Sequence, residues 1–175
     1  MFASLLLLAA AVSACDAEAV RAELRRECDA RMIAGAVVMC AGLERPVVEG
    51  FARLEPEMAP MREGTRFDVA SLTKVFTAAV CARLAADGLI DVDAPFVRYL
   101  PECAVGPGCG ITVRDLALHR SGFVTKNFAA DEPKDPEVFR RRALAHMPQH
   151  PCPNAFLYAC HNYILLGMIA ERVAG

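Results

Sequence analysis

A serine and a lysine three residues apart are the residues of this chain whose types and spacing most suggest chemistry. The stretch that begins at Phe67 reads FDVASLTKVFTAAVCARLAADG and contains Ser71 and Lys74. On a helix, residues three apart lie one turn from each other, with Cβ atoms about 5–6 Å apart. A lysine near a helix N-terminus lies at the positive end of the helix dipole, where a cation is disfavoured. Burial and the dipole together are therefore expected to lower the pKa of Lys74.

This pair predicts nucleophilic catalysis. A neutral Lys74 amine can accept the proton of the Ser71 hydroxyl, while the helix dipole stabilises the developing anion. The alternative is a chance S-x-x-K sequence in which Lys74 extends along the surface into water. The pattern of apolar residues around the pair is that of a buried helix and predicts that this end is packed inside: Leu72, Val75, Phe76, Ala79 and Val80.

The elements that must position this pair are predicted from periodicity and turn residues. A helix is expected over residues 16–29, with Ala19, Val20, Leu24 and Cys28 on its apolar face. Two strands that form a hairpin, with a turn at Gly42, should follow, and then helices only. The predicted ranges are 33–40 and 46–54 for the strands, 55–67 for a loop, 69–87, 111–122, 135–147 and 162–174 for helices, and 89–102 for a turn with a short helical segment.

Composition describes a globular chain and excludes several function classes. The 175 residues are 55% hydrophobic and 23% charged, with a formal net charge of -2 and no basic patch, so nucleic acid is not an expected partner. The eight cysteines lack C-x-x-C spacing, so a zinc site is not predicted. No organic cofactor is implied either. Cys40 and Cys81 lie in apolar runs and are expected in the core. Cys103 and Cys109 could pair in an exported protein, but the cysteines as a set favour unpaired thiols and a reducing compartment.

The first fifteen residues leave the localisation open. Residues 1–15 read MFASLLLLAAAVSAC, an apolar run followed by small residues that is typical of a signal or lipoprotein segment, with Cys15 as the lipidated residue. The positively charged region that begins a signal peptide is missing. An apolar N-terminal helix packed on the body is the alternative. Export and a cytoplasmic location therefore both remain open, and the run is too short to span a bilayer.

Four segments, in order, resemble the serine β-lactamase and penicillin-binding protein family, especially the class C β-lactamase-like esterases and DD-peptidases. They are IAGAVV, the nucleophile segment from Phe67 through Glu102, ITVRDLALHRSGF and YACHNYILLGMIAERVAG. The resemblance covers residues 16–175, read as one domain incomplete at its C-terminus. It implies an α+β fold of the β-lactamase/DD-peptidase type, truncated, with a small partial antiparallel sheet and a helical region.

The resemblance also implies roles for three side chains. Ser71 corresponds to the acylated nucleophile and Lys74 to its activating base. Tyr158, 84 residues after Lys74, corresponds to the tyrosine that passes a proton to or from the leaving group. One oxyanion N–H would come from Ser71 itself.

The histidines are not expected to act in catalysis. His119 and Ser121 fall in a segment that resembles a structural motif of the family, in which Arg120 replaces the commoner threonine. A Ser–His–Asp arrangement that uses His119 or His161 is possible from composition alone. Nothing in the spacing of these residues supports it.

Two departures from the family pattern concern substrate binding. The second motif is normally Tyr-x-Asn, but here Cys160 stands in place of the substrate-binding asparagine, and a thiol is a weak donor and a weak acceptor. The third motif, Lys-Thr-Gly or His-x-Gly, is absent, since none of Lys74, Lys126 and Lys134 precedes Thr-Gly. The resemblance places that motif on a strand that also supplies the second oxyanion N–H.

Several functions therefore remain open. The first is a serine hydrolase that forms an acyl-enzyme with an ester, amide or β-lactam-like substrate, with weak activity or none in this truncated form. The second is a non-catalytic relative that binds a peptidoglycan-like ligand or a partner, and the third is a fragment without activity. A small-molecule or peptidoglycan-like substrate is expected, and membrane association only if Cys15 is lipidated. The sequence does not predict an oligomeric state.

Overall fold

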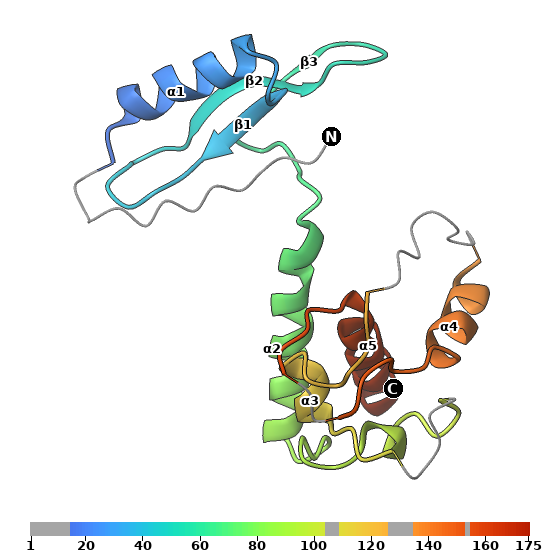
Figure 1. Ribbon diagram of the computed structural model, residues 1–175. Helices are drawn as coiled ribbons and strands as arrows, with labels where there is room; N and C mark the ends of the chain where they lie inside the picture. Colours follow the sequence, from blue (N-terminus) through green and yellow to red (C-terminus); the bar gives the residue numbers. More distant parts are fainter. Residues whose placement is uncertain (1–14, 104–108, 126–134, 153–154) are drawn as a thin grey trace. The chain divides into compact units, whose positions relative to one another are not determined.

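The chain divides into two compact units that are described separately. The structure, a computed structural model, describes residues 15–103, 109–125, 135–152 and 155–175. One unit comprises Met1–Asp68 and the other Val69–Gly175. Figure 1 shows that the strands belong to the first unit and that the second unit is helical.

The first unit contains a small antiparallel sheet with the order β1-β2-β3. Its strands are β1 (Gly35–Val38), β2 (Val47–Arg53) and β3 (Ala59–Pro60). The predicted hairpin is present, and Gly42 in its turn has a left-handed φ of 94°. The predicted loop 55–67 was wrong in one respect, because β3 lies within it and pairs with β2. Two residues, one of them a proline, are too short a run to show strand alternation in the sequence.

Helix α1 (Ala17–Asp29) accompanies this sheet and confirms the first predicted helix. It begins after Asp16, whose carboxylate accepts two backbone N–H groups of the first turn. Arg21 and Arg25 donate to Glu49 of β2 at 2.6 and 3.2 Å. On its predicted apolar face, Val20, Leu24 and Cys28 are partly buried, whereas Ala19 is exposed.

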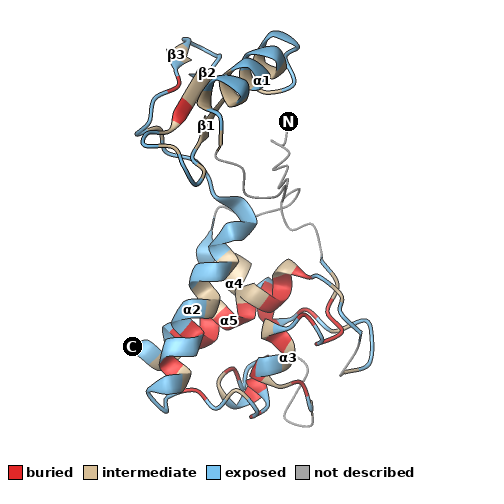
Figure 2. Cartoon of the chain, turned by 90° about the vertical axis from the view of Figure 1, so that its left-hand side faces the viewer, coloured by how far each residue is buried: buried red, intermediate tan, exposed pale blue. Residues whose placement is uncertain are grey.

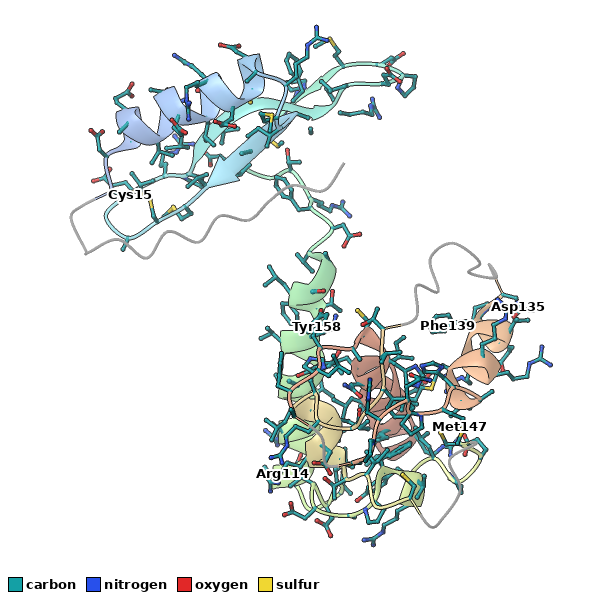
Figure 3. All side chains as sticks on the ribbon, viewed as in Figure 1. Cys15, Arg114, Asp135, Phe139, Met147 and Tyr158 are labelled. Carbon is teal, nitrogen blue, oxygen red and sulfur yellow. A yellow bond between two sulfur atoms is a disulfide. The ribbon has the colours of Figure 1, made fainter. Side chains whose placement is uncertain are left out.

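The cysteines of the first unit differ from the prediction. Cys15 and Cys40 form a disulfide, drawn in Figure 3, so Cys40 is neither a core residue nor a free thiol. A lipid on Cys15 would need the same sulfur, so the disulfide and lipidation exclude each other. Residues 1–14 of the predicted signal segment lie outside the described residues. No helix in the described part of the chain is long and apolar enough to cross a membrane.

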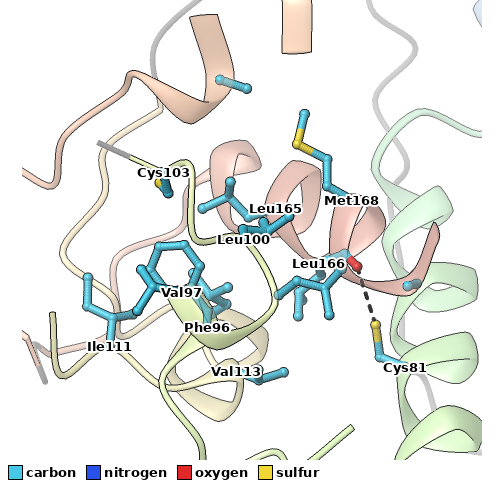
Figure 4. Packing of buried hydrophobic residues seen from close by; sticks show 14 of the residues in the cluster. Cys81, Phe96, Val97, Leu100, Cys103, Ile111, Val113, Leu165, Leu166 and Met168 are labelled. Atoms are coloured by element: carbon cyan, nitrogen blue, oxygen red, sulfur yellow. Dashed lines mark hydrogen bonds between the residues drawn. The ribbon is translucent and has the colours of Figure 1, made fainter. Parts of the chain in front are cut away.

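The second unit is built around one long, buried helix. Its elements are η1 (Ala70–Leu72), α2 (Thr73–Ala86), η2 (Phe96–Arg98), α3 (Val113–Ala117), α4 (Pro136–Leu144) and α5 (Cys160–Ala174). Most buried residues in Figure 2 lie around α5, where fully buried side chains form a hydrophobic core: Phe96, Leu100, Leu116, Leu165, Leu166 and Ile169. Figure 4 shows part of this core and labels Phe96, Leu100, Leu165 and Leu166.

Several of the predicted helix boundaries shift. The helix predicted over 111–122 is the single turn and a half of α3, with Thr112 and Asp115 forming the predicted capping box. Helix α5 begins two residues before the predicted start, at Cys160. Cys103 and Cys109 do not form the disulfide considered for an exported protein, as the expectation of unpaired thiols implies for this pair; the Cys103 thiol lies 3.3 Å from the Leu144 carbonyl oxygen.

The packed face of α2 is not the one that the sequence predicted. The five apolar residues expected to be buried are exposed, with Val75 at 64% and Phe76 at 66%. The buried residues are instead Cys81, whose thiol lies 3.6 Å from the Leu166 carbonyl oxygen, and Leu84. Lys74 is half-buried on the same face, seven residues before Cys81, which is two helical turns. The lysine therefore lies on the side of α2 that packs against α5.

Candidate active site

Ser71 lies at a backbone irregularity directly before α2. It is exposed and belongs to the 3₁₀ turn η1, whereas the sequence predicted the first turn of the α-helix. The preceding residue, Ala70, has a left-handed φ of 44°, which costs a non-glycine residue about 1–2 kcal/mol. Such strain is characteristic of functional sites, and it was not visible in the sequence because alanine carries no signal for it.

Lys74 points at the Ser71 hydroxyl. Its Nζ donates to Ser71 Oγ at 3.1 Å and to Cys160 Sγ at 3.6 Å. The same nitrogen lies 5.1 Å from the centre of the Tyr158 ring, within range of a cation–π interaction. Lys74 thus has three partners: Ser71, Cys160 and the Tyr158 ring.

The pKa of Lys74 is raised, which contradicts the expected lowering. Burial alone would lower the pKa, but the Tyr158 hydroxyl and the Cys160 thiol outweigh burial. Both groups become negative on losing a proton, and each of them then favours an ammonium beside it. Lys74 is therefore an ammonium at neutral pH rather than a free amine. The residues next to Lys74 in the sequence indicate only desolvation and the helix dipole, whereas Tyr158 and Cys160 come from far along the chain.

Tyr158 completes the group from the segment that leads into α5. Its Oη lies 2.8 Å from Ser71 Oγ, and either atom can be the donor. The side chain is 44% exposed and lies beside α2 in Figure 3. The ring also contacts the imidazole of His119, with centroids 4.7 Å apart. The structure therefore brings together Ser71, Lys74 and Tyr158, the three residues singled out in the sequence. The Ser71 hydroxyl is within hydrogen-bond distance of both the Tyr158 hydroxyl and the Lys74 nitrogen.

Cys160 is the first residue of α5 and completes the surroundings of Lys74. Its backbone N–H donates to Thr125 Oγ1 at 3.2 Å, and Thr125 Oγ1 donates to the Tyr158 carbonyl oxygen at 3.3 Å. Thr125 thus links the residues on either side of Ala159. Sequence reasoning missed Thr125, since a single threonine after a predicted helix carries no distinctive signal.

Neither candidate histidine contacts Ser71 in the described part of the chain. His119 contacts the Tyr158 ring, and its Nδ1 accepts a hydrogen bond from the backbone N–H of Ala159 at 3.2 Å. His161 is fully buried, with Phe123 and His146 rings within 5 Å, and burial lowers its pKa to about 3. Among the described residues, no group of three or more His, Cys, Asp or Glu side chains could hold a metal ion.

Known proteins of similar sequence and structure agree with this architecture. Residues 17–175 match the Beta-lactamase family. Esterase/beta-lactamase LipL from Mycobacterium tuberculosis (strain ATCC 25618 / H37Rv) is 31% identical over 127 residues, which are 72% of this chain and 28% of that protein.

Two solved structures share the fold. A class C beta-lactamase superposes with a TM-score of 0.72 at 23% identity, over 91% of this chain and 45% of that chain. The penicillin binding protein from Bacillus halodurans gives 0.70 at 25% identity, over 87% and 50%. The matches cover 45% of one curated mycobacterial relative, 28% of LipL and 45–50% of these two solved chains, so the chain spans about half of their length or less. The chain therefore corresponds to part of the β-lactamase/DD-peptidase fold and belongs to the Beta-lactamase family.

Proposed function

We propose that this chain carries the acylation machinery of a serine hydrolase, with Ser71 as the nucleophile. The observation that supports it is the position of the Ser71 hydroxyl, which lies 2.8 Å from the Tyr158 hydroxyl and 3.1 Å from the Lys74 nitrogen. A nucleophile, a proton acceptor and a cation within direct contact are the parts that nucleophilic catalysis needs. The match to esterase and β-lactamase relatives agrees with this chemistry.

The expected reaction follows from which of these three groups holds the proton at each step. Ser71 Oγ attacks the substrate carbonyl carbon, the new O–C bond forms, and the carbonyl π electrons move to the oxygen. The Ser71 proton passes to the Tyr158–Lys74 pair and from there to the leaving group as its bond to carbon breaks. Because Lys74 is an ammonium at neutral pH, the reactive form is the one in which the pair has lost a proton. Water then hydrolyses the acyl-enzyme by the same route in reverse.

The substrate is an ester, an amide or a β-lactam-like compound. At the position where the family has an asparagine, Cys160 presents a thiol that lies 3.6 Å from Lys74. A thiol holds a substrate amide weakly. We therefore expect activated esters, which need little positioning, to react better than β-lactams.

A second candidate is a non-catalytic relative that binds a peptidoglycan-like ligand or a partner. The thiol at Cys160 favours it. Losing one oxyanion donor typically costs about 10²–10³ in rate. If this chain acts without a second donor, turnover should be slow even though acylation is possible.

Covalent labelling of Ser71 tests the proposal. The 175-residue chain, Ser71→Ala and the matched control Thr73→Ala, which removes an exposed hydroxyl two residues away, are treated with a fluorescent fluorophosphonate and a fluorescent penicillin. We expect labelling by the fluorophosphonate in the unmodified chain and in Thr73→Ala, and none in Ser71→Ala. Hydrolysis of a p-nitrophenyl ester should be slow and that of nitrocefin slower. If a folded chain is not labelled by either probe, the non-catalytic candidate stands instead.

A further inference from the structure

We propose that His119 is a positioning residue that holds Tyr158 against Ser71. This inference rests on the proposed function, since it concerns the geometry of the same site. His119 is not itself one of the reacting groups of the proposed mechanism, and the inference gives it a role in placing one of them.

His119 holds the chain on both sides of Tyr158. Its carbonyl oxygen accepts the N–H of Leu157 at 2.9 Å, and its Nδ1 accepts the N–H of Ala159 at 3.2 Å. The two residues that flank Tyr158 are thus both hydrogen-bonded to His119. A shift of about 1 Å in a reacting group can cost about 10²-fold in rate, so this attachment bears directly on the distance between Tyr158 and Ser71.

The imidazole also contacts the Tyr158 side chain. The two ring centroids are 4.7 Å apart with planes tilted by 38°. His119 is buried, whereas Tyr158 is 44% exposed. The buried ring is therefore the fixed support, and the tyrosine rests on it with its hydroxyl free to reach Ser71.

The hydrogen bonds around His119 have only one consistent direction. The Ser121 hydroxyl accepts the N–H of Phe123 and donates to Asn162 Oδ1 at 2.5 Å. This fixes the Asn162 amide with its NH₂ toward His119 Nδ1, at 3.0 Å. Nδ1 thus receives two N–H donors, from Asn162 and Ala159, and must carry a lone pair. The attachment works only with the neutral ring, protonated on Nε2.

The backbone of His119 explains why few residues could replace it. Its φ is 55°, in the left-handed region where histidine and asparagine are enriched and other side chains are strained. An asparagine there could place Oδ1 near the position of Nδ1, because both atoms are bonded to Cγ. It would keep the acceptor without the ring and without a proton to gain.

Protonation of His119 should release Tyr158. The titratable side chains that face the imidazole are Lys74 from α2, Tyr158 from the preceding segment and Tyr163 from α5. Burial and then the Lys74 charge lower the pKa of His119. The imidazolium would turn Nδ1 from an acceptor into a donor opposite two other donors. Acylation should therefore fall on the acid side as His119 gains a proton.

Two substitutions separate the acceptor from the ring. His119→Asn keeps the acceptor, and His119→Phe keeps an aromatic ring against Tyr158 but removes the acceptor. Rates of fluorophosphonate labelling at Ser71 are measured from pH 4 to 9 in both variants and in the unmodified chain. We expect His119→Phe to lose about 10- to 100-fold in rate at all pH values. His119→Asn should stay within about fivefold at pH 8 and should lose only the additional decrease at acid pH that protonation of His119 causes, while the decrease due to the Tyr158–Lys74 pair remains. Equal rates in His119→Phe and the unmodified chain would overturn the proposal.

A second measurement keeps the inference testable if His119→Phe does not fold or if Ser71 is not the nucleophile. The ¹⁵N spectrum of histidine-labelled chain reports the tautomer without any activity, and His119→Asn identifies the signal. We expect the Nε2–H tautomer for His119 at neutral pH. The Nδ1–H tautomer would refute the attachment. If Ser71→Ala labels like the unmodified chain while this tautomer is found, the proposed function fails and the attachment of the Tyr158 segment stands.

Discussion

The hydroxyl of Tyr158 provides the sharpest test of the proposed proton transfer. Tyr158→Phe removes one oxygen that lies 2.8 Å from Ser71 Oγ, and it leaves the ring against His119. Loss of a general acid–base group costs about 10²–10⁴ in rate, which is about 3–5 kcal/mol of transition-state stabilisation. The side chain is 44% exposed, so loss of its neutral hydrogen bond should cost about 1 kcal/mol of folding stability or less. The expected signature is a large loss of rate in a protein of nearly unchanged stability.

The assay is the rate of fluorophosphonate labelling at Ser71, measured with the urea midpoint of the same samples. Tyr163→Phe is the matched control, because the Tyr163 ring also lies near Lys74 and His119 but its hydroxyl donates to the Ala117 carbonyl at 3.2 Å. Tyr163→Phe should label within about threefold of the unmodified chain, as expected for a hydroxyl outside the reacting group. If Tyr158→Phe also labels within that range, the Tyr158 hydroxyl does not carry the proton and the reasoning fails.

Two further predictions follow from the titrating groups. Because the pKa of Lys74 is raised, the labelling rate should still increase with pH above neutrality; Cys160→Ala removes one of the groups that raise this pKa and should move the increase to lower pH, and an unchanged profile would show that the thiol does not influence Lys74. Burial lowers the pKa of His161 from an ordinary value of 6.5 to about 3. Between these two pH values the His161 imidazole therefore stays neutral in the folded protein but takes up a proton in the unfolded chain. The stability from its neutral burial should be complete above pH 6.5 and fall as the pH approaches 3, by about 1.4 kcal/mol per pH unit and at most about 5 kcal/mol. Urea unfolding should show this slope in the control His150→Gln and a smaller slope in His161→Phe; equal slopes would contradict it.

Local sequence signals were sufficient for much of the secondary structure. Asp16 begins α1, Gly42 turns the hairpin, and the capping box at Thr112 begins α3, because each of these features depends on residues within one turn of each other. The two-residue strand β3 and the 3₁₀ turn before α2 escaped prediction. Both depend on pairing or strain that no short window of sequence contains.

The features that were predicted wrongly, the packed face of α2 and the state of Cys40, depend on tertiary contacts. The apolar run of α2 suggested burial of Val75 and Phe76, but the packed face is set by the contact with α5, and it carries Lys74 with Cys81. Periodicity cannot choose between two faces of a helix when both contain apolar residues. The pairing of Cys40 was missed for a similar reason, since its partner Cys15 is 25 residues away and belongs to no recognisable spacing.

Lys74 occupies an unfavourable position that neighbouring groups make tolerable. A cation at the start of α2, on the face that packs against α5, violates both the dipole and the burial rule. The groups that compensate are the Tyr158 hydroxyl and the Cys160 thiol, and they raise rather than lower the lysine pKa. Since the Tyr158 hydroxyl also lies 2.8 Å from Ser71, the group that stabilises the ammonium is also the one placed to take the serine proton. Folding of the segment before α5 therefore both stabilises Lys74 and brings the Tyr158 hydroxyl to Ser71, the nucleophile that we propose.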